Sequence, residues 1–159
     1  MERPAVEVAV VMEREQAPNR WEAWRHAPVE VVADEEAFGS APRVLRDDGR
    51  VRRTLHPGLR VELFRDECEG YHLNLSSGAP VWFVMWRSDD EDPSRAWPET
   101  VSLSYNEAGR WLDAQERVDN LPLPADVREW LQAFTDANYR PEPKKRSRAA
   151  SFRPLADRG

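Results

Sequence analysis

The sequence contains a single cysteine and no long apolar run, and each shortage excludes a class of protein. Cys68 has no second cysteine to pair with, so no disulfide can form within the chain and export to an oxidising compartment is not indicated. No apolar run reaches the roughly 18 residues that a membrane-spanning helix needs. Acidic residues lie on both sides of the short apolar stretch in residues 1–15, which is not the layout of a signal peptide. We therefore expect a cytoplasmic protein that does not enter the membrane.

Glycines are also few, and they are scattered. The seven glycines occur singly, whereas a phosphate-binding loop needs closely spaced glycines, so the sequence has neither a P-loop nor a dinucleotide-binding motif. The GxSxG motif of many hydrolases is absent as well. Among 29 acidic residues, no pair stands out as a catalytic pair of carboxylates. The sequence predicts no catalytic residue and no bound cofactor.

A metal site would have to be built around Cys68, His26, His56 and His72. Zinc ligands usually come in close pairs such as CxxC or HxxxH, but the nearest pair here, Cys68 and His72, is divided by a predicted turn. His56 is instead expected in a His-Pro-Gly turn, and His72 on the solvent side of a strand. The acidic neighbours of Cys68 raise the pKa of its thiol and disfavour the reactive thiolate. We predict no metal ligands, and a structural role for Cys68.

The net charge of −6 is distributed unevenly. Between Arg140 and Gly159 the chain has seven lysines and arginines and two acids, a balance of +5, so residues 1–139 carry −11. An acidic body with a basic tail is typical of a binding protein, because the tail is attracted to a negatively charged partner. The tail could equally bind the acidic body of its own chain, and the sequence leaves both alternatives open.

Most of the first 105 residues show the alternation of apolar and polar side chains that is typical of strands. We expect strands over residues 5–12, 29–32, 59–64, 71–75 and 101–104, and a hairpin over residues 44–51 that turns at Asp48-Gly49. His56-Pro57-Gly58 and residues 68–70 predict further turns. Residues 81–86 are apolar on both faces, which indicates a central strand covered on both sides.

The apolar period changes to that of a helix at Ser104. Ser104 and Glu107 match a capping box, which predicts that a helix begins there. Residues 118–123 end this helix, and Pro124 suits the first turn of a second one. In the second helix four apolar side chains recur at i, i+3, i+4 and i+7, namely Val127, Trp130, Leu131 and Phe134.

Strands followed by helices indicate the α+β class. We predict an antiparallel β-sheet meander or partial barrel, followed by two C-terminal helices and a disordered basic tail. The length of 159 residues suits one domain, which we place at residues 1–139. Residues 140–159 form the tail, because Phe152 and Leu155 alone bury too little surface to offset the entropy lost on ordering.

Two groups of residues are candidates for binding a partner. Trp21 and Trp24, with Arg25, either cover the sheet as core or anchor a partner if they are exposed. The second group is basic and lies in the tail, namely Lys144, Lys145, Arg146 and Arg148. These side chains could also contact nucleic-acid phosphates. The acidic body would repel the same phosphates, however, and no known nucleic-acid module accompanies the tail.

The sequence resembles a family of short bacterial proteins of unknown function that are encoded beside genes for molybdenum- or tungsten-dependent formate dehydrogenase. The similar segments extend along almost the whole chain, over residues 11–14, 21–25, 45–49, 55–58, 69–71, 80–86, 104–112 and 139–146. Some members are labelled as molybdopterin-guanine-dinucleotide biosynthesis proteins, but this chain lacks the glycine-rich loop of such a transferase. The resemblance implies an accessory subunit or a maturation factor, and it supplies no catalytic residues.

The leading hypothesis is a non-catalytic accessory protein that binds a formate dehydrogenase subunit or a related molybdoenzyme. The acidic loop over Asp89–Asp92 would then meet a basic patch on that partner. One alternative is a small-molecule-binding protein or enzyme linked to molybdenum cofactor handling, which requires a pocket with a buried titratable group. Another is a nucleic-acid-binding regulator that acts through the tail.

Overall fold

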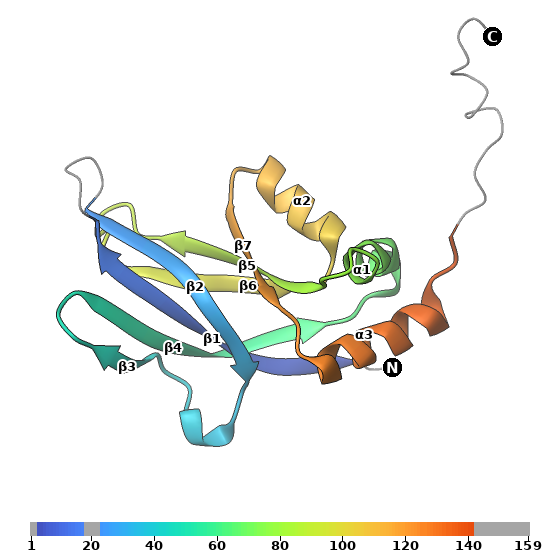
Figure 1. Ribbon diagram of the computed structural model, residues 1–159, viewed down its shortest axis with the longest axis horizontal. Helices are drawn as coiled ribbons and strands as arrows, with labels where there is room; N and C mark the ends of the chain where they lie inside the picture. The colour runs from blue at the N-terminus through green and yellow to red at the C-terminus, as the bar shows by residue number, and fades with distance from the viewer. Residues whose placement is uncertain (1–2, 18–22, 142–159) are drawn as a thin grey trace, which may run out of the picture.

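Two antiparallel sheets and three α-helices make up the computed structural model, which describes residues 3–17 and 23–141 (Figure 1). Sheet A has the strand order β2-β1-β4-β3, with bounds β1 Ala5–Gln16, β2 Trp24–Ala33, β3 Arg43–Asp47 and β4 Val51–Glu62. Sheet B has the order β6-β5-β7, with bounds β5 Val81–Ser88, β6 Ala96–Ser102 and β7 Arg117–Pro122. The helices are α1 Cys68–Leu75, α2 Tyr105–Asp113 and α3 Ala125–Asn138, and the short 3-10 helices are η1 Glu36–Phe38 and η2 Arg65–Glu67. The predicted α+β class is confirmed, with open sheets and no closed barrel.

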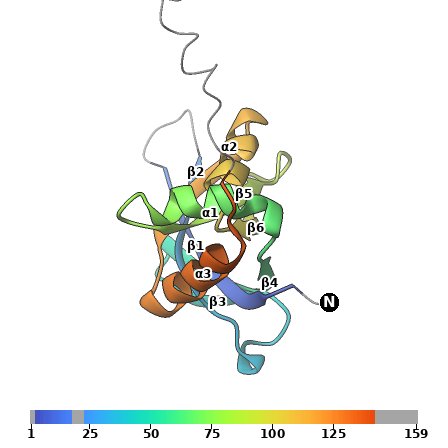
Figure 2. The same ribbon diagram turned by 90° about the vertical axis from the view of Figure 1, so that its right-hand side faces the viewer.

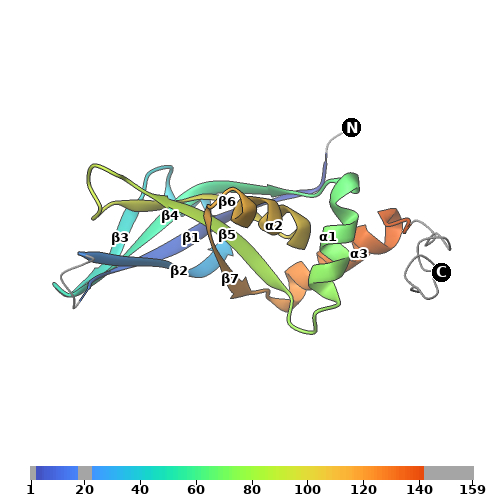
Figure 3. The same cartoon turned by 90° about the horizontal axis from the view of Figure 1, so that it is seen from above.

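The main core lies between the two sheets. β4 contacts β6 and β2 contacts β7, so the sheets pack face to face. α2 covers the outer face of sheet B, while α1 and α3 pack on each other at one end of the sheets (Figures 2 and 3). Side chains from both sheets and from α1 and α3 meet in this core, among them Val10, Tyr71, Trp82, Val84 and Leu131. The inner face of sheet A is therefore covered by sheet B along much of its length.

Both strands with the clearest apolar patterns form as predicted. In β1, Val8, Val10 and Met12 point into the main core. The intervening Ala9 and Val11 are buried as well, in a small second cluster on the outer face that Phe38 of η1 helps to cover. β5 lies between β6 and β7 and is buried on both faces, as its doubly apolar sequence indicates.

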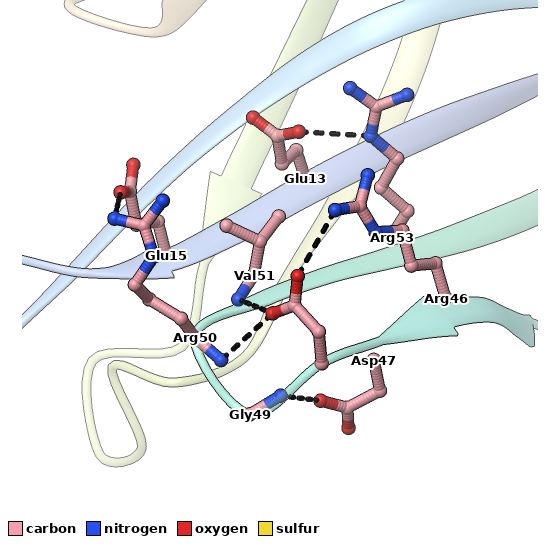
Figure 4. Close-up of polar contacts among 9 residues, drawn as sticks. Glu13, Glu15, Arg46, Asp47, Gly49, Arg50, Val51 and Arg53 are labelled. Carbon is pink, nitrogen blue, oxygen red and sulfur yellow. Dashed lines mark hydrogen bonds and ion pairs between the residues drawn. The ribbon is translucent and has the colours of Figure 1, made fainter.

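The hairpin predicted at Asp48-Gly49 connects β3 and β4 (Figure 4). Gly49 has φ of +87°, a conformation that glycine adopts without steric cost. Asp48 accepts hydrogen bonds from the main-chain N–H groups of Arg50 and Val51, at 3.0 and 2.8 Å. These bonds lower the pKa of Asp48 to about 2.

The turn predicted at His56-Pro57-Gly58 is wrong, because these residues form a bulge inside β4. Val8 pairs with Leu59 and Val10 pairs with His56, so one extra residue of β4 lies opposite β1. Gly58 takes φ of +84° there, and its N–H donates to Asp34. Glycine and proline serve a bulge as well as a turn, so composition alone does not separate the two.

The turn and strand predicted over residues 68–75 are also wrong, because this segment is helix α1. The alternation of Tyr71 and Leu73 with polar residues suggested a strand. The buried residues instead follow the helical period, with Cys68, Tyr71, Asn74 and Leu75 facing the core. His72 is exposed, as expected, but it stacks on Tyr139 of the segment after α3, with ring centroids 5.0 Å apart.

The C-terminal half contains both predicted helices and one strand that the sequence did not reveal. α2 begins at the predicted cap, and α3 begins directly after Pro124. The segment between them is not simply a break, because residues 117–122 form strand β7 at the edge of sheet B. The predicted tail lies outside the described residues from position 142 onward.

Candidate functional site

A cleft of about 290 Å³ lies between the inner face of sheet A and the start of β6 in sheet B. Its lining is mixed, with cationic, imidazole and apolar side chains side by side. The lining residues are Met12, Glu13, Arg14, His26, Pro42, Arg52, Thr54, His56, Ser94, Arg95, Ala96 and Trp97. The cleft continues the main core, because Met12 belongs to both.

One row of charged and imidazole side chains crosses all four strands of sheet A at this cleft. Arg14 of β1 pairs in register with His26 of β2 and with Arg52 of β4, and Arg52 pairs with Asp47 of β3. Arg14 follows Val8, Val10 and Met12 on the inward face of β1, so the face that starts as apolar core ends as a polar row.

Arg14 is held from two sides. Its guanidinium lies over the ring of Trp24, with Cζ 4.5 Å from the ring centroid, and its Nη1 donates to the carbonyl of Ser94 at 3.1 Å. Burial lowers the pKa of Arg14, and the like charge of Arg52 lowers it further. The carboxylate of Asp47 is bound to Arg52 at 3.1 Å. Among the described residues, no carboxylate forms an ion pair with Arg14.

Burial favours the neutral form of both histidines of the cleft. Burial is the main cause that lowers the pKa of His26 and the cause that lowers the pKa of His56. His26 Nε2 lies 2.8 Å from the carbonyl of Pro93. A carbonyl only accepts, so Nε2 must carry the proton, which leaves Nδ1 as an acceptor without a hydrogen-bond partner among the described residues.

The acidic loop between β5 and β6 covers this cleft and satisfies much of its own charge. Asp89 accepts from the main-chain N–H groups of Glu91 and Asp92, and it pairs with Arg95 at 3.2 Å. Asp92 accepts from the N–H and the hydroxyl of Ser94, and these bonds lower its pKa. The loop therefore presents main-chain carbonyls to the cleft.

The outer face of sheet A offers a contrast to Arg14 (Figure 4). There Arg53 donates to Glu13 at 2.9 Å, and Arg50 lies 3.5 Å from Glu15. Each of these arginines has a carboxylate partner on β1. The more enclosed guanidinium of Arg14 is bound to a carbonyl instead, so the cleft retains positive charge.

A second surface lies between α2 and β7. A groove of about 440 Å³ is lined by Phe83, Tyr105, Ala108, Gly109, Leu112, Val118, Asp119 and Asn120. Tyr105 and Leu112 are each 57% exposed, which is high for large apolar side chains. The ring of Tyr105 meets Phe83 edge to face, with centroids 6.4 Å apart. The groove is mostly apolar, with Asp119 and Asn120 as its polar residues.

A partly buried polar network fixes α2 in place. The Ser104 hydroxyl caps the helix by accepting from the N–H of Glu107, and it donates to Glu67 at 2.6 Å. Only this half of the predicted capping box forms, because the Ser104 N–H donates to the Ser102 hydroxyl and not to the Glu107 carboxylate. The other carboxylate oxygen of Glu67 binds Arg110 of α2, also at 2.6 Å. Gly70 of α1 lies directly against Ser104, where no side chain would fit. The groove on α2 therefore stands on a rigid support.

The sequence candidates are only partly covered by the structure. Trp24 is half-buried beneath Arg14, and Arg25 is exposed beside it. Trp21 and the basic tail residues lie outside the described residues, namely Lys144, Lys145, Arg146 and Arg148. Cys68 is buried, and burial raises the pKa of its thiol. Within residues 3–17 and 23–141, no three potential ligands gather into a metal site.

The sequence did not identify the row of Arg14, His26 and Arg52, nor the groove on α2. A signal for the row was present, because Arg14 occupies the next inward position after three apolar residues on a regular strand. The sequence did not show which strands pair with β1, and these strands bring His26 and Arg52 beside Arg14.

No described helix has the length and apolar character needed to cross a bilayer.

Comparison with known proteins gives one match. Neither the curated proteins nor the solved structures contain a match to this chain. The family model described as "Protein of unknown function (DUF3305)" matches residues 7–148, which include the three described α-helices and both sheets apart from the first two residues of β1. The chain therefore belongs to the DUF3305 family of proteins of unknown function.

Proposed function

We propose that this protein is a non-catalytic accessory or maturation factor that acts by binding another protein, namely a subunit of a molybdenum- or tungsten-dependent formate dehydrogenase. The observation that carries the binding role is the exposed apolar groove between α2 and β7. The choice of partner rests on the resemblance described above. The proposal includes a cytoplasmic location, in which the unpaired Cys68 remains a thiol.

The groove has the properties of a protein-binding surface. Tyr105 and Leu112 each keep 57% of their surface in solvent, although burying such a side chain fully is worth about 1.5–3 kcal/mol. Partner binding would recover part of that free energy. Aromatic side chains in particular often dominate protein interfaces. Because the network around Ser104 fixes α2, little ordering entropy is lost on binding.

The charge of the chain indicates the chemistry of the partner surface. Residues 1–139 carry a net charge of −11. A complementary surface would place an apolar anchor in the groove and basic side chains around it, which speeds association through long-range attraction. The acidic loop over residues 89–92 would contribute to the same attraction. The basic tail would add a second, separate contact with an acidic region of the partner.

The proposal is tested by purifying the tagged full-length chain from its native cells and identifying the bound proteins by mass spectrometry. Leu112→Asp and Tyr105→Ala should reduce recovery of formate dehydrogenase subunits about tenfold or more, the effect typical of interface hot spots. Leu45→Asp is the matched control, because Leu45 is also an exposed leucine (50%) but lies on β3 of sheet A. Removal of residues 140–159 tests the tail separately.

The outcomes separate the parts of the proposal. Loss with Leu112→Asp and retention with Leu45→Asp would support docking at the groove. Equal recovery with both variants would exclude the groove as the docking surface. If the well-expressed wild-type chain recovers no formate dehydrogenase subunit, the accessory role is wrong.

A second candidate function is the binding of a small molecule, which the cleft between the sheets favours. This cleft contains two half-buried titratable imidazoles and an arginine without a paired carboxylate among the described residues. These are the features expected of a ligand site.

A further inference from the structure

We propose that the cleft between the sheets is a binding site for a small tetrahedral oxyanion, the dianionic phosphate group, either free or at the end of a small organic molecule. The site is formed by Arg14, Arg52, His26 and His56. It is separate from the groove on α2, so the proposal does not depend on the accessory role.

The cleft carries positive charge that the described carboxylates do not fully balance. Arg14 and Arg52 occupy directly paired positions on neighbouring strands, where like charges repel. Asp47 neutralises Arg52 at 3.1 Å, but Arg14 has no ion-pair partner in the described part of the chain. Asp47 and Asp92 act on Arg14 only from a longer range. A bound anion would relieve the repulsion and supply the missing partner.

The guanidinium groups of Arg14 and Arg52 are already held in place by other residues. Trp24 supports the face of the Arg14 guanidinium at 4.5 Å, and the Ser94 carbonyl fixes one of its N–H groups. The Arg52 Nε–H is fixed by Asp47. Each guanidinium has five N–H donors, so most of the donors on both remain for a ligand. Arginine is the residue best suited to bind the oxygens of a phosphate in pairs.

The two imidazoles of the cleft are further hydrogen-bonding groups. His56 is half-buried in the cleft and forms no side-chain hydrogen bond with any described residue. His26 is positioned by the Pro93 carbonyl. As neutral groups they add hydrogen-bonding capacity without further repulsion of Arg14. An arginine without a paired carboxylate among the described residues, with two imidazoles beside it, matches an anion better than a neutral ligand or a cation would.

The volume of the cleft limits the size of the ligand. A volume of about 290 Å³ is at the lower end of known ligand pockets, which run from about 300 to 1,000 Å³. The cleft therefore admits a phosphate group and a short organic extension. Met12 and Ala96 give it an apolar wall that suits such an extension.

The test is isothermal titration calorimetry on the full-length chain at constant ionic strength. The probes are inorganic phosphate, sulfate and glycerol 3-phosphate, with chloride as the reference anion. Arg14→Gln and Arg52→Gln remove one positive charge each from the cleft. Arg53→Gln is the matched control, because it removes the same charge from the adjacent residue of β4, whose side chain pairs with Glu13 on the outer face. Circular dichroism establishes that each variant is folded.

We expect saturable binding that weakens about tenfold or more in Arg14→Gln and changes less than about twofold in Arg53→Gln, as loss of a charge-assisted hydrogen bond predicts. If Arg14→Gln does not fold, Arg52→Gln decides the result. Tighter binding of glycerol 3-phosphate than of inorganic phosphate identifies an organic phosphate as the ligand class, and the reverse identifies the free anion. Absence of binding by all three probes up to about 10 mM would overturn the proposal, as would equal loss in the cleft variants and the control.

Discussion

Gly70 offers the sharpest test of how α1 and α2 are packed. In the middle of an ordinary helix, replacing glycine by alanine stabilises the protein by about 1 kcal/mol. At Gly70 the new methyl group would overlap the hydroxyl of the buried Ser104 and lie 3.0 Å from the main-chain nitrogen of Asn106. The substitution Gly70→Ala should therefore destabilise the fold, against the propensity of the residue.

The magnitude follows from two costs and one gain. Overpacking of a close contact costs about 1–3 kcal/mol. Displacement of the Ser104 hydroxyl also weakens the cap of α2, which is worth about 1 kcal/mol. Subtraction of the propensity gain leaves a net loss of about 1–3 kcal/mol in the free energy of unfolding. For a chain of this size, each kcal/mol corresponds to about 2–4 °C in Tm.

The assay is urea unfolding followed by tryptophan fluorescence. Gly109→Ala is the matched control, because Gly109 is also inside a helix but an added methyl would meet no atom within 4 Å. It should stabilise the protein by about 0.5–1 kcal/mol. If Gly70→Ala is as stable as wild type, the close contact between α1 and Ser104 is wrong.

Three further predictions concern Asn74, the two histidines of the cleft and Cys68. Asn74→Ala should cost about 3 kcal/mol or more in urea unfolding, because the side chain makes three hydrogen bonds to main-chain groups of sheet B and its flank, and their loss leaves buried groups unpaired; a loss below about 1 kcal/mol would contradict this network. Because burial lowers the pKa values of His26 and His56 from 6.5, the folded state binds fewer protons than the unfolded state. The stability that the neutral histidines contribute is therefore fully present above pH 6.5, and it falls as the pH drops through that value. The variant with glutamine at both positions should lose less stability between about pH 7.5 and pH 5 than wild type, and an equal loss would show that other groups are responsible. Cys68 should react with a thiol reagent only at the rate of unfolding, since it is buried and its pKa is raised; rapid labelling of the native protein would contradict its placement.

The two proposals concern different faces of the molecule and can therefore fail independently. The groove on α2 is mostly apolar and exposes Tyr105 and Leu112, which suits a protein surface. The cleft between the sheets is smaller and contains Arg14 and Arg52, which suits a small anion. A variant that abolishes one kind of binding should leave the other intact, and Leu112→Asp and Arg14→Gln can be compared in both assays.

The sequence by itself determined the features that depend on neighbouring residues. The alternation in β1, the doubly apolar β5 and the turn at Asp48-Gly49 all formed as predicted, because each pattern has one low-energy local solution. The cap at Ser104 and the apolar stripe of α3 are local in the same sense. These elements were sufficient to assign the α+β class.

Tertiary packing decided the rest. Residues 71–75 alternate like a strand but form a helix, because Gly70 and the buried Asn74 let α1 pack closely on α2 and sheet B. β7 forms because β5 offers it an edge to pair with. The cationic row exists only because three strands, separated by many residues in the chain, bring His26, Arg14 and Arg52 into register. Hydrogen bonding between distant strands sets that register, and no short stretch of sequence specifies it.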